Sequence, residues 1–215
     1  EGKSGLLNAR GEEVFPCIYD DIWYWCDDFA VILQEDKYGI VNRAGDLVYP
    51  CICENIYSYC NSAALAKQDG KEMLIGIRDG SIVSLFFDSI ECYSQFSGFV
   101  SVCQQGENGP KYGIYDSQCN QVVPCMYDYV VIEEDTYVTG PFPVQKDGKF
   151  GYVAHDGKLV IPCIYEHVGF FHGELALVSM EGKFGMIDRS GKLILPCIYD
   201  VDEDYFDCCP FSYYY

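Results

Sequence analysis

The chemistry that this sequence could support rests first on its carboxylates, and three of them have the spacing of a cation site. Asp200, Asp202 and Asp204 alternate along the chain as the first oxygen ligands of a calcium-binding loop do. Such a loop also requires a glycine at its sixth position and a glutamate at its twelfth, where this chain has Tyr205 and Phe211. We therefore expect no metal cofactor, and metal ligation by the three aspartates is the weaker interpretation of an acidic, solvated rim.

A catalytic role for the carboxylates is the least favoured interpretation of the sequence. A glycoside-processing enzyme would need two of them facing each other, about 5 to 5.5 Å apart in a retaining enzyme. The histidines are His155, His167 and His172, and none has a serine or cysteine nucleophile in a recognisable context. No glycine-rich phosphate loop follows a predicted strand. The sequence thus predicts neither an enzyme nor a bound cofactor.

The overall charge narrows the choice of partner. The 215 residues include 14 Lys and Arg against 33 Asp and Glu, a formal charge of −19, and 16% of the chain is aromatic. Repulsion by this charge argues against nucleic acid and against an anionic membrane surface. No apolar run reaches the roughly 18 residues of a membrane-spanning helix. We expect a protein or peptide partner, and a basic one suits the charge.

Two short motifs recur along the chain and indicate a repeat array. The first is Pro-Cys-x-x followed by an acid, and its third copy, 84–88, retains only the aromatic residue and the acid. The recurring acids are Asp20, Glu54, Asp88, Asp128, Glu166 and Asp200. The second motif, Lys-x-Gly, precedes the first, and its glycines are Gly5, Gly39, Gly113, Gly151 and Gly185, with Leu74-Ile75-Gly76 as a degenerate copy. A fixed period of this length is typical of stacked supersecondary units.

The spacing between the motifs separates a constant part of each repeat from a variable part. The interval from glycine to acid is the same in five repeats, as from Gly39 to Glu54. In the third repeat, from Gly76 to Asp88, it is shorter by three, so this repeat is expected to lack three residues. The interval from acid to the next glycine varies, so one loop absorbs the insertions. We expect one domain of six repeats of about 34–38 residues, with approximate bounds 1–34, 35–70, 71–107, 108–146, 147–180 and 181–215.

The pattern within a repeat predicts an all-β fold. Apolar residues alternate with period two in 38–42 and 47–49, and β-branched and aromatic residues predominate there. Pro50 follows directly and cannot donate to a sheet, so it ends a strand or bends it at an edge. Glycines in polar turns supply the positive φ that hairpins need. Each repeat can hold three longer strands and a short fourth one.

The recurring acid is expected to serve the architecture of each repeat. A short acidic side chain after a turn can accept hydrogen bonds from nearby backbone N–H groups, or pair with the lysine two residues before each motif glycine. The aromatic residue before the acid is expected to pack between repeats rather than against a ligand. A role repeated in every unit favours architecture over ligand binding.

The cysteines predict a reducing environment. There are 13 of them, and five occupy the second position of the Pro-Cys motif, as a small buried hydrophobic residue would. No Cys and His spacing of a structural zinc site is present in the sequence. We expect reduced thiols and a cytoplasmic or other reducing compartment, with disulfides in an extracytoplasmic location as the alternative.

With these motifs in place, the chain resembles the bacterial WG-repeat family. Units of that family contain a Gly-Lys-Trp-Gly strand, an Ile-Pro-x-x-Tyr-Asp segment and a Phe-Ser-x-Gly-Leu-Ala strand. The family's tryptophan is replaced here by Tyr38, Tyr112, Phe150 and Phe184, and the third segment persists best at 96–100 and 171–176. The resemblance covers essentially the whole chain, and it implies a repeat module with no catalytic signature to carry over.

Six such repeats can close into a ring or continue as an open stack, because one sheet alone cannot bury both of its faces. A propeller-like closed ring is favoured, since the segment around Phe211 corresponds to the strand beginning at Phe29 and could pair with the first Lys-x-Gly strand. An open β-solenoid or superhelical stack is the alternative, because about 34 residues is short for a four-stranded propeller blade.

Binding is expected where the repeats differ or where aromatic side chains reach the surface. The candidate binding residues are Trp23, Trp25, Glu133, Glu134, Asp135 and Tyr137. The leading interpretation is a non-enzymatic binding or scaffold module that presents an acidic, tyrosine-rich β surface to a protein or peptide. A carbohydrate or cell-wall binding module is the alternative, and it requires Trp23 and Trp25 to be exposed so that they can stack on sugar rings.

Overall fold

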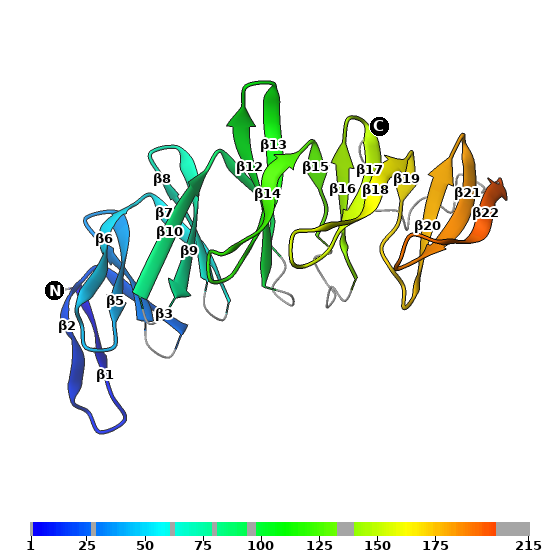
Figure 1. Cartoon of the computed structure of the whole chain (residues 1–215). Helices are drawn as coiled ribbons and strands as arrows, with labels where there is room; N and C mark the ends of the chain where they lie inside the picture. The colour runs from blue at the N-terminus through cyan, green and yellow to red at the C-terminus, as the bar shows by residue number, and fades with distance from the viewer. Residues whose placement is uncertain are drawn as a thin grey trace. The chain divides into compact units, whose positions relative to one another are not determined.

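A computed structural model describes residues 2–26, 29–60, 63–78, 81–93, 98–132 and 140–200 of the chain. All regular secondary structure in these ranges consists of antiparallel β-strands, so the all-β prediction is confirmed (Figure 1). The described strands form one sheet of two strands and five sheets of four. Within these ranges we find no helix with the length and apolar character needed to cross a membrane.

The strands of each sheet follow one another in chain order, so each sheet is an up-and-down meander. The two-stranded sheet contains β1 (Ser4–Leu7) and β2 (Glu13–Tyr19). The next two sheets contain β3 (Asp21–Cys26), β4 (Phe29–Gln34), β5 (Lys37–Asn42) and β6 (Leu47–Cys53), and β7 (Asn55–Cys60), β8 (Ala63–Gln68), β9 (Lys71–Arg78) and β10 (Ser81–Phe87).

The remaining three sheets repeat this arrangement. They contain β11 (Ser89–Tyr93), β12 (Phe99–Gly106), β13 (Gly109–Asp116) and β14 (Gln121–Tyr127); β15 (Tyr129–Val130), β16 (Phe142–Lys146), β17 (Lys149–Val153) and β18 (Leu159–Tyr165); and β19 (His167–Val168), β20 (Leu175–Met180), β21 (Lys183–Asp188) and β22 (Leu193–Tyr199). In each four-stranded sheet the last strand carries the Pro-Cys motif or its equivalent, and this strand forms one edge of the sheet.

Sheets and sequence repeats do not share boundaries. The acid marks the joint, since β3 begins at Asp21, directly after Asp20, and β6 ends at Cys53, directly before Glu54. The boundary expected between residues 34 and 35 therefore falls at the turn between β4 and β5, in the middle of a sheet. Each four-stranded sheet thus takes two strands from each of two successive sequence repeats.

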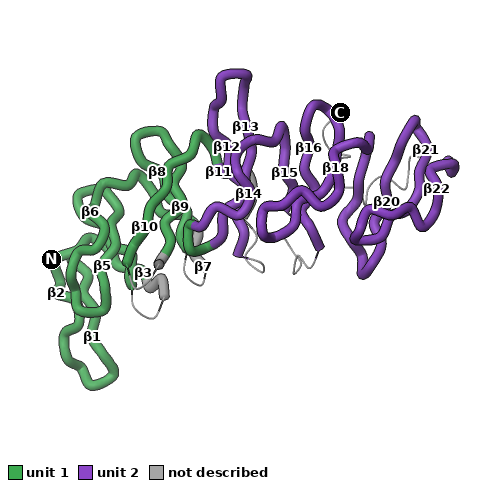
Figure 2. The backbone as a smooth tube through the Cα atoms, viewed as in Figure 1, with its two compact units in different colours: residues 1–89, 117–119 green, residues 90–116, 120–215 purple. Residues whose placement is uncertain are grey.

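The chain divides into two compact units, coloured separately in Figure 2. The first comprises residues 1–89 with 117–119, and the second comprises 90–116 with 120–215. The expectation that all six repeats form a single domain stays a prediction, and each unit is described here by itself.

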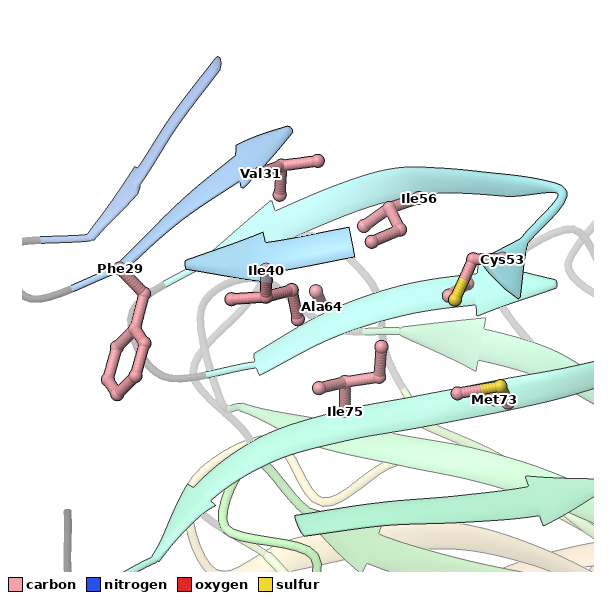
Figure 3. Packing of buried hydrophobic residues seen from close by; sticks show 9 residues of the cluster. Phe29, Val31, Ile40, Cys53, Ile56, Ala64, Met73 and Ile75 are labelled. Atoms are coloured by element: carbon pink, nitrogen blue, oxygen red, sulfur yellow. The ribbon is translucent and has the colours of Figure 1, made fainter. Parts of the chain in front are cut away.

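Successive sheets within a unit bury apolar side chains between their faces. In the first unit, Val31 and Ile40 of one sheet pack with Ala64, Met73 and Ile75 of the next (Figure 3). In the second unit, the fully buried Tyr152 packs in the same way between two sheets and donates its hydroxyl hydrogen to the Gly169 carbonyl at 2.6 Å. The strand-period alternation predicted from the sequence supplies these inward-facing residues.

A large bulge explains why the Pro-Cys and Lys-x-Gly motifs occur together. Tyr38 pairs with Cys53 and Ile40 with Tyr49, so three residues of β5 face five residues of β6. The extra residues bring the backbone and thiol of Cys51 so close to Gly39 that a Cβ there would lie 2.7 Å from Cys51 Sγ. The same bulge occurs in five repeats, and only glycine fits opposite it.

The third repeat differs from what its sequence suggested. Gln68 pairs with Lys71 as Gln34 pairs with Lys37, which places Met73 rather than Gly76 in the motif-glycine position. Met73 precedes Asp88 by the same interval as Gly39 precedes Glu54, so the expectation of a three-residue loss is wrong. Strands β9 and β10 pair one to one without a bulge, so no glycine is needed and Met73 is fully buried.

Candidate functional site

The recurring acids lie at the joints between sheets, where five of them pair with the motif lysine of the same repeat. The ion pairs are Lys3 with Asp20 at 2.6 Å, Lys111 with Asp128 at 2.5 Å, Lys149 with Glu166 at 3.4 Å, Lys183 with Asp200 at 2.5 Å, and Lys71 with Asp88. Glu54 and Lys37, both within the described ranges, form no such pair. In the four-stranded sheets the lysine stands near the start of the third strand, and the acid follows the last strand.

The second oxygen of the acid accepts a hydrogen bond from the next sheet. The Asp20 Oδ2 atom accepts the Glu35 N–H at 2.9 Å, and the Asp128 Oδ2 atom accepts the Asp147 N–H at 2.6 Å. Both N–H groups belong to tight turns with left-handed φ values of 53°. The carboxylate thus links two sheets, and the groups that donate hydrogen bonds to it belong to this chain.

These contacts favour the charged form of the acids. The hydrogen bond from Lys3 lowers the pKa of Asp20, with the Glu35 N–H adding to the effect. The pKa of Asp128 is lowered chiefly by the hydrogen bond from Lys111. The Gly182 N–H, bound to Glu166 at 2.8 Å, is the main cause of the lowered pKa of Glu166. None of these carboxylates has the raised pKa expected of a general acid.

The residue just before the acid points into the sheet-to-sheet core. Tyr19, Cys53, Phe87, Tyr127 and Tyr165 are all buried, whereas Tyr199 of the last described strand is 49% exposed. Because side chains alternate along a strand, the residue one position earlier must point outward.

An exposed apolar residue therefore recurs two positions before every acid, and sequence reasoning missed it. We call this set the outer row, and its members are Ile18, Ile52, Phe86, Met126, Ile164 and Ile198. Their side chains are 42–63% exposed, so they contribute little to the core, although all six are large and apolar. Three lie in each compact unit. The signal available in the sequence was an apolar residue in all six copies, next to a residue predicted to be buried.

A groove lies beside the outer row in the second unit. It has a volume of about 450 Å³ and lies between Met126 of β14 and Leu159 of β18, with Lys146 and Lys149 at its rim. A second groove, of about 610 Å³, lies in the first unit beside β1, with Leu6, Phe15 and Phe29 among its lining residues. Both grooves mix apolar walls with charged side chains, Asp147 in the second unit and Asp21 and Arg43 in the first.

The motif cysteines are free thiols packed at the bulges. The five motif cysteines form no disulfide in the described part of the chain, and Cys17 is the exposed one among them. Burial raises the pKa of Cys51, Cys163 and Cys197, and it raises the pKa of Cys125 to about 11. Such thiols are poor nucleophiles at neutral pH, in keeping with a packing role.

The structure describes the side chain of one of the six binding candidates predicted from the sequence. Trp23 is half-buried, packs against the core of the first unit and lies 5.7 Å from the ring of Tyr38. The side chain of Trp25 and residues Glu133, Glu134, Asp135 and Tyr137 lie outside the described part of the chain.

The structure describes one of the three aspartates of the candidate cation site. Asp200 is held by Lys183, while Asp202 and Asp204 lie outside the described residues. Among the residues that the structure does describe, no three Asp, Glu, His or Cys side chains cluster in a way that could hold a metal ion. Of the histidines, His155 bonds through Nε2 to the Gly140 carbonyl at 2.8 Å and packs against Phe142. The His167 side chain is half-buried, and desolvation lowers its pKa.

Comparison with known proteins identifies the repeats. The family model described as "WG containing repeat" matches residues 5–38, 38–71, 150–184 and 184–201, which together make up 119 of the 215 residues. The stretch between these matches contains the third repeat, whose motif glycine and bulge are missing. No curated protein matches the sequence.

Several solved structures are similar at low identity. A crystal structure of the eukaryotic initiation factor is 12% identical, with a TM-score of 0.38, over 91% of this chain and 61% of that chain. Hsv2 of Kluyvelomyces marxianus is 11% identical, with a TM-score of 0.31, over 82% of this chain and 67% of its own. Apo AztD of Citrobacter koseri is 10% identical, with a TM-score of 0.32, over 94% and 67%. The chain spans less than two thirds of the initiation factor, and scores this low carry no argument about function.

Proposed function

The chain belongs to the WG containing repeat family, and on this premise we propose that it is a non-enzymatic binding module whose outer row holds a protein or peptide. The observation that carries the proposal is the outer row itself. Six large apolar side chains stand 42–63% exposed at one repeated position, although exposure of that position costs hydrophobic burial in each repeat. A repeated exposed apolar group is explained by a partner that covers it.

The charge of the surroundings selects a basic partner. The whole chain has a formal charge of −19, a sum that already includes the five lysines paired with carboxylates beside the outer row. A peptide with apolar side chains for the outer row and Lys or Arg between them matches both features. Tyr57 is a further exposed aromatic side chain in the first unit, and its pKa is raised by desolvation and, to a lesser extent, by the Glu72 carboxylate.

Carbohydrate binding is the competing function, and the structure gives it less support. It depends on exposed tryptophan faces, whereas Trp23 packs against Tyr38 and the core. A glycan array therefore serves as the second arm of the test. Binding to glycans together with failure to bind basic peptides would overturn the proposal.

The direct test replaces the outer row within one unit. In the first unit, serine would replace Ile18, Ile52 and Phe86; in the second unit it would replace Met126, Ile164 and Ile198. The probe is an acetylated peptide of about eight residues that alternates lysine and valine, and its affinity is measured by fluorescence anisotropy. We expect at least about a tenfold loss of affinity, because several apolar contacts are removed.

A matched control separates the outer row from exposed apolar surface in general. Leu47 and Leu193 are 54% and 45% exposed and begin the strands that carry Ile52 and Ile198. Serine at these two positions should leave peptide affinity within about twofold of the parent protein. Equal losses in the two variants would show that the outer row has no special role.

A closed ring of the six repeats is part of the same proposal. It rests on the sequence correspondence between the segment around Phe211 and the strand beginning at Phe29. Small-angle scattering gives the test, because a ring and an open stack of six sheets differ in radius of gyration. A scattering profile fitted by an extended stack would exclude the ring.

A reducing compartment is also proposed, on the basis of the five motif cysteines, which form no disulfide within the described ranges. Most of them are packed at the bulges, where a disulfide partner would have to displace backbone. Thiol titration of protein purified without reductant checks this, and recovery of fewer than the 13 thiols of the sequence after unfolding would argue for disulfides in the cell.

A further inference from the structure

The edge strand of the third repeat lacks the protection that the other repeats share. In five repeats the last strand of the sheet carries a proline four positions before the acid, at the large bulge opposite the motif glycine. Proline removes a backbone donor and a bulge disrupts regular pairing, so both prevent another strand from adding to this edge. These edges are closed to strand addition by their sequence.

Strand β10 has neither the proline nor the bulge. Ser84 stands in the proline position, and β10 pairs with β9 one to one along its whole length, from Ser81 with Arg78 to Phe87 with Glu72. The loss of the bulge is matched by Met73 in place of the glycine, so the change is built into the packing of the repeat. The result is a straight, regular edge strand.

Strand β10 forms one edge of its sheet in the described part of the chain. In the sheet order β10-β9-β8-β7, β10 has β9 on one side and no described strand on the other. Other parts of the chain also contact it: the Ser84 side chain interacts with the Tyr49 hydroxyl, and the Cys119 thiol lies 3.7 Å from the Val83 carbonyl oxygen. Its outer-row residue, Phe86, is 46% exposed at the end of the same strand.

We propose that β10 is the point where the partner adds as a fifth strand, an extended basic peptide segment without proline. This rests on the proposed function and specifies where the peptide backbone is held. Main-chain hydrogen bonds to β10 would supply affinity, while the exposed Phe86 on the same strand contacts an apolar side chain of the peptide. Residues 1–89 contain 7 Lys and Arg against 15 Asp and Glu, a charge of −8, which selects Lys and Arg in the peptide.

The first experiment keeps the protein unchanged and alters the peptide backbone. The lysine-valine probe is compared with a version that is N-methylated at alternate residues, which removes the hydrogen-bond donors on one edge and retains every side chain. We expect the methylated probe to bind at least about tenfold more weakly. Equal affinities would overturn strand addition.

The second experiment gives the third repeat the features of the other five. The variant combines Met73→Gly, Ser84→Pro and Leu85→Cys, a set of residues that five repeats already accommodate. We expect it to bind the unmethylated probe at least about tenfold more weakly and to lose the slowing of amide exchange at β10 that the probe causes in the parent protein. Unchanged binding with unchanged protection at β10 would overturn the proposal.

The two proposals fail in different ways. If the outer-row variants lose affinity while N-methylation has no effect, the binding module stands and strand addition at β10 is wrong. If N-methylation and the repaired third repeat weaken binding but the outer-row variants do not, the peptide is held by β10 alone and the outer row is not its contact. Circular dichroism of each variant confirms that the β structure is retained.

Discussion

The thiol of Cys51 packs directly on Gly39, so closely that a Cβ on Gly39 would lie 2.7 Å from Sγ and 2.9 Å from the backbone nitrogen of Cys51. The side chain could rotate away, but the backbone of a bulge held in a sheet cannot. The two residues, which belong to different motifs, therefore depend on each other in five repeats, and the third repeat has lost both together.

Gly39→Ala should destabilise the protein by about 1–3 kcal/mol, the usual cost of overpacking a rigid site. Urea unfolding followed by fluorescence measures the change. Gly169→Ala is the matched control, because a Cβ on Gly169 would meet Leu177 at 3.7 Å, an ordinary contact. A Gly39 variant as stable as the Gly169 variant would contradict the account of the bulge.

Asp128→Asn should lower the free energy of unfolding by about 1 kcal/mol, because the ion pair with Lys111 is lost and the hydrogen bond from Asp147 becomes neutral. Glu54→Gln provides the comparison within the same motif, since Glu54 has no ion pair with Lys37. We expect the Glu54 variant to differ from the parent by a few tenths of a kcal/mol at most. The two variants are compared by thermal unfolding at low and high salt, where only the Asp128 effect should shrink with salt.

Stability should fall on acidification because the pKa values of Asp20, Asp128 and Glu166 are lowered in the folded state. In the unfolded chain these carboxylates bind protons at roughly pH 4, above their pKa values in the folded protein. Their contribution to the free energy of unfolding is therefore complete above that pH and is lost as the pH falls through the folded-state pKa values. Unfolding by urea at a series of pH values between about 6 and 3 tests this. The slope should be smaller for Asp128→Asn, and an identical slope would refute the assignment.

Thiols shielded in the last strand of a sheet should react slowly with alkylating agents. Burial raises the pKa of Cys53 and Cys125 to about 11, so little thiolate is present at neutral pH. Cys17 is exposed and should be alkylated by iodoacetamide at pH 7.5 well before these two. Peptide mapping by mass spectrometry of the folded protein follows each site. Similar rates at Cys17 and Cys125 would show that the bulge does not shield its thiol.

Much of the architecture could be predicted from the sequence because it is periodic. The alternation of apolar residues gave the strands, and the Pro-Cys-x-x-acid motif gave the number of repeats. The joints between sheets at Asp20 and its equivalents were not predicted, because the repeat bounds were placed between the second and third strands of each sheet. The lysine at a constant interval before the acid already suggested the acid's partner. These features are local or regularly spaced, so they are visible without coordinates.

The third repeat could not be aligned by its motifs, because its strands β9 and β10 pair one to one, without the bulge found in the other repeats. A search for glycine selected Gly76, whereas the structural equivalent is Met73, a residue type that the motif excludes. The bulge was also invisible in the sequence, since an extra residue in a strand changes pairing and not composition. The outer row was missed because an apolar residue in every repeat is normally assigned to the core. Only the burial of its neighbour, as at Tyr19 beside Ile18, shows that it faces outward.

The offset between sheets and sequence repeats has a consequence for how such an array can change length. Because each sheet takes two strands from each of two successive repeats, duplication or loss of one whole period restores complete four-stranded sheets wherever in the period the break occurs. Unequal recombination within such a gene would therefore add or remove one sheet at a time while leaving every joint acid with its lysine, so the array can lengthen without passing through a misfolded intermediate.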